Sequence, residues 1–571
     1  MKSSFGRKTI LALTALGICR LSLLAQPVPH LSITQPGGMP GLPVMMGITR
    51  LTNGVRLTWD GPSGYYQVFQ KSNNLQSAAW LALGKATNLA RTATITQLYN
   101  SAFFRVSGPA TKYAGSKVCI TCHLNICSYE TNTPHASAFS NPVFQSNGGQ
   151  NNSSCLPCHT VGYGLPTGFV SGSATPQLEN VQCENCHGPA ANHAASPDDP
   201  TVVPQVEIAA DVCGGCHSAS HTAYTNPPTF EEWSASGHSA VVPDVLQTMS
   251  SSTNNILSCG VCHSGSARLA LLDGLNPAVA LTKDYNVPQT CAVCHDPHQN
   301  NANPVQLRNP ISSFGNFELT SADTATVSAF TNKYNANANI NLCAQCHNDR
   351  GAAWTDTSRA PHHSLQYNLL LGSIGEQLYL PSPFPGAHAG LPSSAIYSIN
   401  GLFYLTNQCA SCHMPSSSAS STDFSHTFRP GYNVCLNCHD GPTYQASLTF
   451  DLSNQVSQVI GSLNSWAATS APAALRTNGA VAWEYPSSDG LAWQTNSSGQ
   501  LTGWTQSDQV YTNFNGPAAA FQSTLTNYPG ILKARFNLYL ILNDGSFGVH
   551  NPIYARFLLQ SAMAFALSPT N

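Results

Sequence analysis

The chain has 571 residues, only 9% of them Asp, Glu, Lys or Arg, and a formal net charge of −3. This nearly neutral balance, with no basic stripe, argues against a nucleic-acid partner. After the first 25 residues no apolar run approaches the ~18 residues that a membrane-spanning helix needs, so no transmembrane segment is expected. The length predicts about three or four domains.

Residues 1–25 have the pattern of a secretory signal peptide. A basic start is followed by an apolar stretch, Ile10–Ile18, and then by Ala25 at the expected cleavage point. Cys19 offers the alternative of a lipoprotein anchor, but the bulky Ile18 before it makes a poor lipidation box. We therefore expect an exported protein, either periplasmic or extracellular at the cell surface.

The next segments predict a linker and a small β-module. Residues 26–43 are rich in Pro and Gly, which is typical of a linker. Between residues 44 and 108, short runs such as Val55–Trp59 and Ala102–Val106 alternate or cluster like strands, and Gly-containing turns separate them. This spacing predicts a β-sandwich without cysteine. It resembles fibronectin-type-III-like modules of secreted bacterial proteins, which implies a role in spacing or docking.

Residues 109–441 contain nine copies of Cys-x-x-Cys-His. With 20 Cys and 20 His in the chain, chance predicts only about 0.02 copies. The pattern is the attachment signature of c-type haem, in which two thiols bond to the porphyrin and the histidine becomes the proximal iron ligand. Zinc sites are the alternative, but they pair Cys-x-x-Cys units and do not require a His after each one. We therefore expect nine covalently bound haem c groups.

The eighteen motif cysteines are Cys119, Cys122, Cys155, Cys158, Cys183, Cys186, Cys213, Cys216, Cys259, Cys262, Cys291, Cys294, Cys343, Cys346, Cys409, Cys412, Cys435 and Cys438. The nine motif histidines are His123, His159, His187, His217, His263, His295, His347, His413 and His439. Cys19 leaves with the predicted signal, so only Cys127 remains, and we expect it to be a small buried residue rather than a reactive thiol.

The motifs are dense, with about 36 residues of chain per haem. So little protein cannot build an ordinary core around each cofactor, and the porphyrins must supply much of the buried apolar surface. We expect short helices, long loops and little sheet in this mainly α and irregular domain, and neighbouring haems close enough to exchange electrons.

Residues 442–571 predict a helical region packed on the haem domain. Apolar residues from Leu448 to Leu463 recur at spacings of three and four. Residues Ile531–Leu542 predict a second helix, which Asn543-Asp544-Gly545 ends. Asn551 followed by Pro552 predicts a cap and first turn of a last helix that runs to about Leu567.

A second histidine can complete the coordination of each iron. Eleven histidines lie outside the motifs. His30 lies in the predicted linker, and His362 and His363 are adjacent, which leaves about one usable histidine for each iron. The expected distal ligands are His135, His193, His221, His238, His298, His363, His388, His426 and His550. Mostly bis-histidine coordination predicts low-spin, low-potential haems suited to electron transfer.

Several stretches resemble known cytochrome families. Residues 113–119, 183–189 and 228–233 resemble segments of the tetrahaem cytochrome that takes electrons from hydroxylamine oxidoreductase. That resemblance implies three distal ligands, His135, His193 and His238. Residues 409–439 and 548–552 resemble pentahaem cytochrome c nitrite reductase, which implies that His550 is a ligand carried on the helical tail. The Cys-x-x-Cys-Lys motif of the catalytic haem in that reductase is missing here, because all nine motifs end in His.

Three functions compete. The leading hypothesis is an electron conduit between redox protein partners or an extracellular acceptor, with no catalytic residue. The alternative is an oxidoreductase for small nitrogen or sulfur oxyanions at one five-coordinate haem. The open face of that haem would be lined by Arg350, Arg359, His362 and His363, whereas in a conduit the two arginines would pair with haem propionates. The third hypothesis is a structural subunit of a homo-oligomer or an extracellular cytochrome filament.

Overall fold

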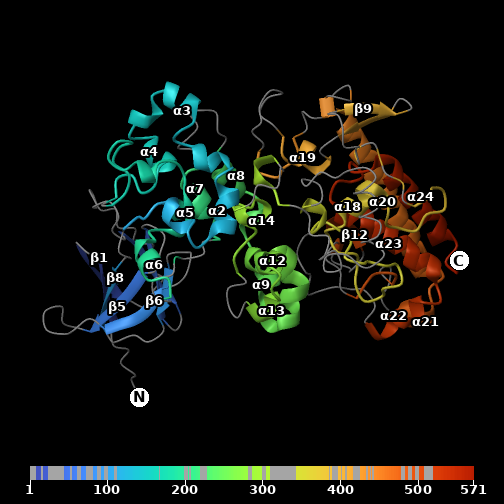
Figure 1. Ribbon diagram of the computed structural model, residues 1–571. Helices are drawn as coiled ribbons and strands as arrows, with labels where there is room; N and C mark the ends of the chain where they lie inside the picture. Colours follow the sequence, from blue (N-terminus) through green and yellow to red (C-terminus); the bar gives the residue numbers. More distant parts are fainter. Residues whose placement is uncertain are drawn as a thin grey trace, which may run out of the picture. The chain divides into compact units, whose positions relative to one another are not determined.

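The computed structural model describes the strands between residues 8 and 107 and, with internal gaps, residues 112–308, 342–506 and 519–570 (Figure 1). The chain forms two compact units, residues 1–231 with 290–306, and residues 232–289 with 307–571. Both units carry haem motifs. The first contains those that begin at Cys119, Cys155, Cys183, Cys213 and Cys291, and the second those that begin at Cys259, Cys343, Cys409 and Cys435. The domain boundaries expected from the sequence stay predictions.

The N-terminal strands form two sheets. The three-stranded antiparallel sheet has the order β3-β4-β7, and the five-stranded sheet has the order β2-β1-β8-β5-β6. The strands are β1 (Lys8–Thr14), β2 (Gly17–Leu23), β3 (Val44–Leu51), β4 (Gly54–Asp60), β5 (Tyr66–Ser72), β6 (Leu81–Ala86), β7 (Thr92–Ile95) and β8 (Ser101–Ser107). Strands therefore lie where the alternation predicted them, while the β-sandwich arrangement stays a prediction. Part of the predicted signal segment forms β1 and β2, of which β1 pairs with β8, and its removal stays a prediction as well.

In the first unit, haem motifs lie on helices of one or two turns. Examples are α1 (Ser116–Cys119), α4 (Leu156–His159), α5 (Cys183–His187), α7 (Ala210–Gly214) and α14 (Cys291–Cys294). The motif histidine closes the turn, as where His217 N donates to Cys213 O at 2.8 Å. A helical turn places residues three apart on one face, so both thiols of a motif project to the same side. A small core of Phe139, Leu156, Val161, Phe169 and Leu178 supports these turns.

The second unit begins with another cluster of short helices. It comprises the second half of α8 (Thr229–Ser234), whose first three residues belong to the first unit, and then α9 (Pro243–Ser251), α10 (Thr253–Asn255), α11 (Val261–His263), α12 (Gly265–Leu272) and α13 (Pro277–Ala280). The motif Cys259–His263 spans a π-helical turn, Ile256–Gly260, and α11. Single π-turns inside helices often mark functional positions because they redirect a side chain.

Three longer helices form the main core of the second unit, α20 (Thr443–Thr469), α23 (Pro529–Asp544) and α24 (Pro552–Leu567) (Figure 1). Their apolar faces pack with Leu365 and Leu369, which lie at and within α18 (Gln366–Leu371). The three helices predicted from the sequence are confirmed. Gly545 ends α23 in the left-handed region, and the Asn551 side chain accepts a 3.2 Å hydrogen bond from Tyr554 N to cap α24.

The remaining described α-helices are α2 (Leu124–Glu130), α3 (Pro142–Ser146), α6 (Ala191–Ala195), α19 (Gln408–His413), α21 (Ala473–Arg476) and α22 (Ala519–Leu525). Two short hairpins, β9 (Ile396–Ile399) with β10 (Leu402–Leu405) and β11 (Leu491–Thr495) with β12 (Leu501–Gln506), interrupt the helices of the second unit. Within the described part of residues 112–441 the helices are short and the sheet content is small, which confirms the expectation for a haem-dense region. Cys127 is 3% exposed, so the prediction of a buried small residue is confirmed.

Candidate haem sites

Seven motif histidines face a histidine from a distant part of the chain. In the first unit the ring centres are 6.3 Å apart for His123 and His193, 6.1 Å for His217 and His135, and 5.8 Å for His187 and His298. In the second unit they are 6.3 Å apart for His347 and His238, 6.3 Å for His263 and His362, 6.4 Å for His439 and His388, and 6.2 Å for His413 and His550. The partners nearest in sequence are His388 and His439, and the most distant are His413 and His550.

These separations fit one metal ion between each pair of rings. Two imidazoles bound on opposite sides of a metal, with nitrogen–metal bonds of about 2 Å, hold their ring centres roughly 6 Å apart. Direct stacking of the rings would bring the centres closer, as for Phe144 and His159 at 4.1 Å. The motif thiols and the paired rings together therefore fit a haem c iron with two histidine ligands.

Burial favours the neutral form, which a metal needs, in seven of the paired histidines. Burial lowers the pKa of His238 and of His263 to about 4, and that of His362 to about 2. Burial also lowers the pKa of four further histidines, His135, His347, His388 and His413. A neutral imidazole keeps a lone pair for coordination.

Hydrogen bonds at Nδ1 orient several of these rings. The Nδ1 acceptors include four backbone carbonyls, Ala138 O for His159 (2.7 Å), Val305 O for His295 (2.8 Å), Val549 O for His388 (2.6 Å) and Phe428 O for His413 (3.0 Å). A carbonyl can only accept, so Nδ1 carries the proton and Nε2 presents its lone pair. Metal-binding histidines are typically oriented in this way.

His362 and His363 compete for one position opposite His263. Their ring centres lie 6.3 and 6.4 Å from that of His263, and one ligand atom of each of the three lies within 4.8 Å of the others. His363 is exposed, whereas His362 is partly buried and its Nδ1 lies 2.8 Å from Ser364 Oγ. Ser364 Oγ donates to Asn348 O at 2.6 Å, so it accepts from His362 Nδ1. This relay leaves Nε2 of His362 free for the metal, and it favours His362 over the His363 expected from the sequence.

Two predicted distal ligands, His221 and His426, are not among the seven pairs. His426 N donates to Glu232 Oε2 at 2.7 Å, and its ring lies 5.9 Å from that of Phe428. His221 and Cys438 lie outside the described residues.

Thiols of different motifs meet within each unit. In the first unit, hydrogen bonding between Cys119 and Cys183 raises the pKa of Cys119 and lowers that of Cys183 to about 5. The same kind of contact joins further pairs, which are Cys158 with Cys216, Cys213 with Cys291, Cys262 with Cys346 and Cys343 with Cys409. Cys435 also lies near enough to Cys412 to raise the pKa of that thiol. Since each thiol marks a porphyrin edge, neighbouring haems would meet at these edges.

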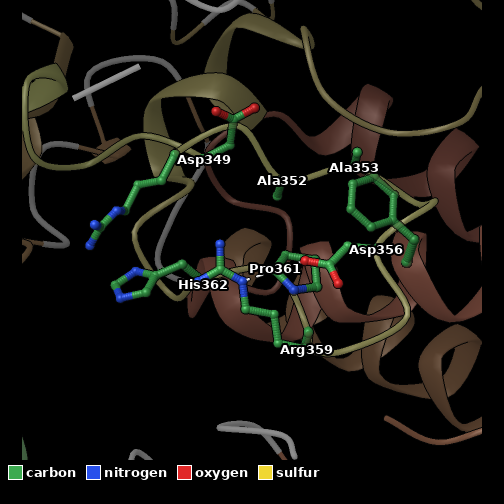
Figure 2. Close-up of a pocket in the computed structure, with 10 residues that line it drawn as sticks. Asp349, Ala352, Ala353, Asp356, Arg359, Pro361 and His362 are labelled. Atoms are coloured by element: carbon green, nitrogen blue, oxygen red, sulfur yellow. Dashed lines mark ion pairs between the residues drawn. The ribbon is translucent and has the colours of Figure 1, made fainter. Parts of the chain in front are cut away.

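A small pocket lies beside His362 (Figure 2). Its walls include two guanidinium groups, Arg350 and Arg359, and two carboxylates, Asp349 and Asp356. Arg359 Nε forms an ion pair with Asp356 at 3.5 Å, which Figure 2 marks with a dashed line. The structure thus brings three of the four residues of the predicted oxyanion face together, but their charges are balanced by the two carboxylates.

Glu184, inside the third motif, is a buried residue that sequence reasoning did not single out. It is 3% exposed and accepts hydrogen bonds from three backbone amides, Ala190 N at 2.7 Å, Gly115 N at 2.8 Å and Ala114 N at 3.0 Å. Burial raises the pKa of Glu184 although the three amides lower it. The carboxylate thereby fastens the segment before the first motif to the third motif.

Replacing Glu184 with alanine is expected to destabilise the first unit by about 2 kcal/mol, because three backbone amide donors, two of them buried, lose their acceptor. The measurement is the guanidinium midpoint of the haem-loaded protein, followed by its Soret absorbance. Asp198→Ala, which removes an exposed carboxylate from the same unit, is the control and should leave the midpoint unchanged. Equal midpoints for Glu184→Ala and the parent would contradict this role.

Part of the chain is similar to known cytochromes. Residues 118–188 match the family model described as cytochrome c554 and c-prime, a segment that contains the first three motifs. Together with the repeated motif, this match supports a multihaem c-type cytochrome. Cytochrome c-554 of Nitrosomonas europaea is 30% identical over 93 residues, which is 14% of this chain and 40% of that protein. The chain thus matches less than half of its curated relative's length.

Among solved structures, the crystal structure of the outer cell wall cytochrome OcwA is similar with a TM-score of 0.48 and 16% identity, over 80% of this chain and 99% of that one. Within the described residues, we find no helix with the length and apolar character needed to span a bilayer.

Proposed function

We propose that the chain is an electron-transfer cytochrome that holds nine covalently bound haem c groups, most of them with two histidine ligands. The seven histidine pairs at 5.8–6.4 Å carry this proposal. Each pair is formed from a motif histidine and a distant one, at the spacing that a shared metal requires. Haem iron, when bound, exchanges single electrons, and the protein's part is to fix its ligands and surroundings.

We assign the ligands by these pairs. The proposed distal ligands in the first unit are His193 for His123, His135 for His217 and His298 for His187. Those in the second unit are His238 for His347, His362 for His263, His388 for His439 and His550 for His413. His362 thus replaces His363 in the set expected from the sequence. His221 and His426 stay proposed ligands without an assigned motif, and the motif cysteines are the proposed attachment points.

The meeting of thiols from different motifs supports conduction along the haems. In the first unit the fourth motif, Cys213–His217, contacts both the second and the sixth through its thiols. In the second unit the fifth motif contacts the seventh, the seventh contacts the eighth, and the ninth lies near the eighth. Haems attached at touching thiols have adjacent edges, so electrons can pass between them. No side chain then needs to act as an acid, a base or a nucleophile.

The cellular setting follows from the same proposal. The predicted N-terminal signal supports an exported protein that works in the periplasm or at the cell surface. Its partners would be redox proteins or an extracellular acceptor, and the N-terminal β-module would space or dock the haem region. Assembly into a homo-oligomer or filament remains a separate hypothesis.

The test is to count haems and their spin states in the same sample. We expect nine haems per chain by pyridine haemochrome assay, with predominantly low-spin signals in the electron paramagnetic resonance spectrum of the oxidised protein. Rings that are nearly parallel, such as His187 and His298 at 13°, should give a different low-spin signal from nearly perpendicular ones, such as His388 and His439 at 88°. Seven or fewer haems in mature protein, or mostly high-spin iron, would contradict the proposal.

A further inference from the structure

The distal histidine of the eighth motif has a partner of unusual charge. His550 Nδ1 lies 2.6 Å from Oδ1 of Asp544, whose side chain is fully buried. The other carboxylate oxygen, Oδ2, accepts a hydrogen bond from the Ser546 hydroxyl and one from Ser546 N at 3.3 Å. Ser546 Oγ in turn accepts from His550 N at 3.2 Å. The carboxylate and the imidazole are therefore fixed relative to one another by three contacts besides their own.

This carboxylate contrasts with the Nδ1 partners that the structure shows for six other histidines. Those partners are neutral oxygens. They are the four backbone carbonyls of Ala138, Val305, Val549 and Phe428, the side-chain oxygen of Gln366 and the hydroxyl of Ser364. Among these described rings, His550 is thus the one whose Nδ1 proton is shared with a negative charge.

The placement of Asp544 strengthens its effect. It is the last residue of α23, where the helix dipole is negative and disfavours a second negative charge. A carboxylate is a stronger hydrogen-bond acceptor than a neutral oxygen, and burial keeps solvent and salt from screening its charge. A strong acceptor at Nδ1 draws the proton away from the ring and makes the nitrogen that faces the metal more basic. A more basic ligand and a nearby negative charge both stabilise the oxidised iron over the reduced one.

We propose that Asp544 is a positioning residue that lowers the reduction potential of the haem held by His413 and His550. The inference rests on the proposed ligation of that haem by His550. The eighth motif touches the seventh through Cys409 and lies near the ninth through Cys412. A lower potential makes electron transfer onto the eighth haem less favourable, and Asp544 thereby affects how readily electrons pass between the seventh and ninth haems.

The test is a spectroelectrochemical titration of the haem-loaded Asp544→Asn protein. Asparagine keeps an acceptor oxygen for His550 but removes the charge, so one redox transition should move to higher potential while every haem stays low-spin. Asp451→Asn is the matched control, because it removes a half-exposed carboxylate, paired with Arg556 at 3.2 Å, from the same helical bundle. Its titration should coincide with that of the parent. Asp544→Glu, which restores the charge, should return the transition toward its original position.

The outcomes separate this inference from the proposed function. If Asp544→Asn keeps all haems low-spin and shifts no transition, the tuning role is wrong. If Asp544→Asn loses a low-spin signal and Asp544→Glu does not regain it, the carboxylate serves only the fold and the tuning role is again wrong. If His550→Ala leaves every haem low-spin, the ligation itself fails, independently of any result with Asp544.

Discussion

The His550→Ala protein is expected to carry all its haems but to show one high-spin iron that the parent lacks. The ring of His550 faces that of His413 at 6.2 Å, although helices α20 and α23 lie between the two residues in sequence. Alanine offers no ligand atom, so the haem of the eighth motif would lose its sixth ligand. The measurement is electron paramagnetic resonance of the oxidised protein at low temperature.

The same change should loosen the C-terminal helices. His550 lies between α23 and α24, so its coordination would tie both helices to the haem-bearing part of the second unit. We expect faster proteolysis between Gly545 and Asn551 in the variant. His30→Ala is the control, because His30 is outside the expected ligand set. A His550→Ala protein with an unchanged low-spin spectrum would show that His550 only bonds to Asp544 and stabilises the turn.

The second large effect on haem spin state is expected at His362 and His363, the adjacent histidines that face His263. We expect His362→Ala to convert the haem of His263 from low-spin to high-spin and His363→Ala to leave it low-spin. The reason is the relay from His362 Nδ1 through Ser364 Oγ to Asn348 O, which holds His362 in the ligating tautomer, whereas His363 is exposed. Visible and electron paramagnetic resonance spectra of the two variants provide the comparison.

His363→Ala is also the matched control, because it removes the same ring from the neighbouring position. A high-spin haem in His363→Ala but not in His362→Ala would restore the ligand expected from the sequence. If only the double variant becomes high-spin, either histidine can serve and the relay does not decide between them. Ser364→Ala should keep the haem low-spin in most molecules, because it removes the support of the ring but not the ligand atom.

Short-range patterns in the sequence were sufficient to predict the helices of the C-terminal region and the residues that would attach the haems. The Cys-x-x-Cys-His spacing needs only one helical turn, and the three-and-four spacing from Leu448 to Leu463 marks the buried side of α20. The Asn551 cap and the Gly545 stop are likewise set by neighbours in sequence. Such features depend on the residues within a few positions of them, which is why they could be predicted.

The pairing of histidines could not be predicted in the same way. Which ring meets which depends on contacts between segments far apart in the chain, and no local pattern encodes them. The choice between His362 and His363 required the hydroxyl of Ser364 and the carbonyl of Asn348. In the sequence, Asp544 stands out only as part of the Asn543-Asp544-Gly545 turn that ends a helix. Its closeness in sequence to a predicted ligand was the available signal, but an acid at such a spacing is common without such a contact.

The long sequence separation of the paired histidines has a consequence for the unfolded chain. On the proposed ligation, each pair closes a loop of the size that a long-range disulfide would close, and a covalent link across about 100 residues restricts an unfolded chain by roughly 4–5 kcal/mol. The loop from His413 to His550 encloses both α20 and α23, and thus most of the C-terminal helical bundle. The described cysteines form no disulfide. Coordinate bonds would instead lower the conformational entropy of the unfolded chain and thereby stabilise the folded one. Loss of one axial histidine would then destabilise the whole segment that the loop encloses, in addition to changing the coordination of its own iron.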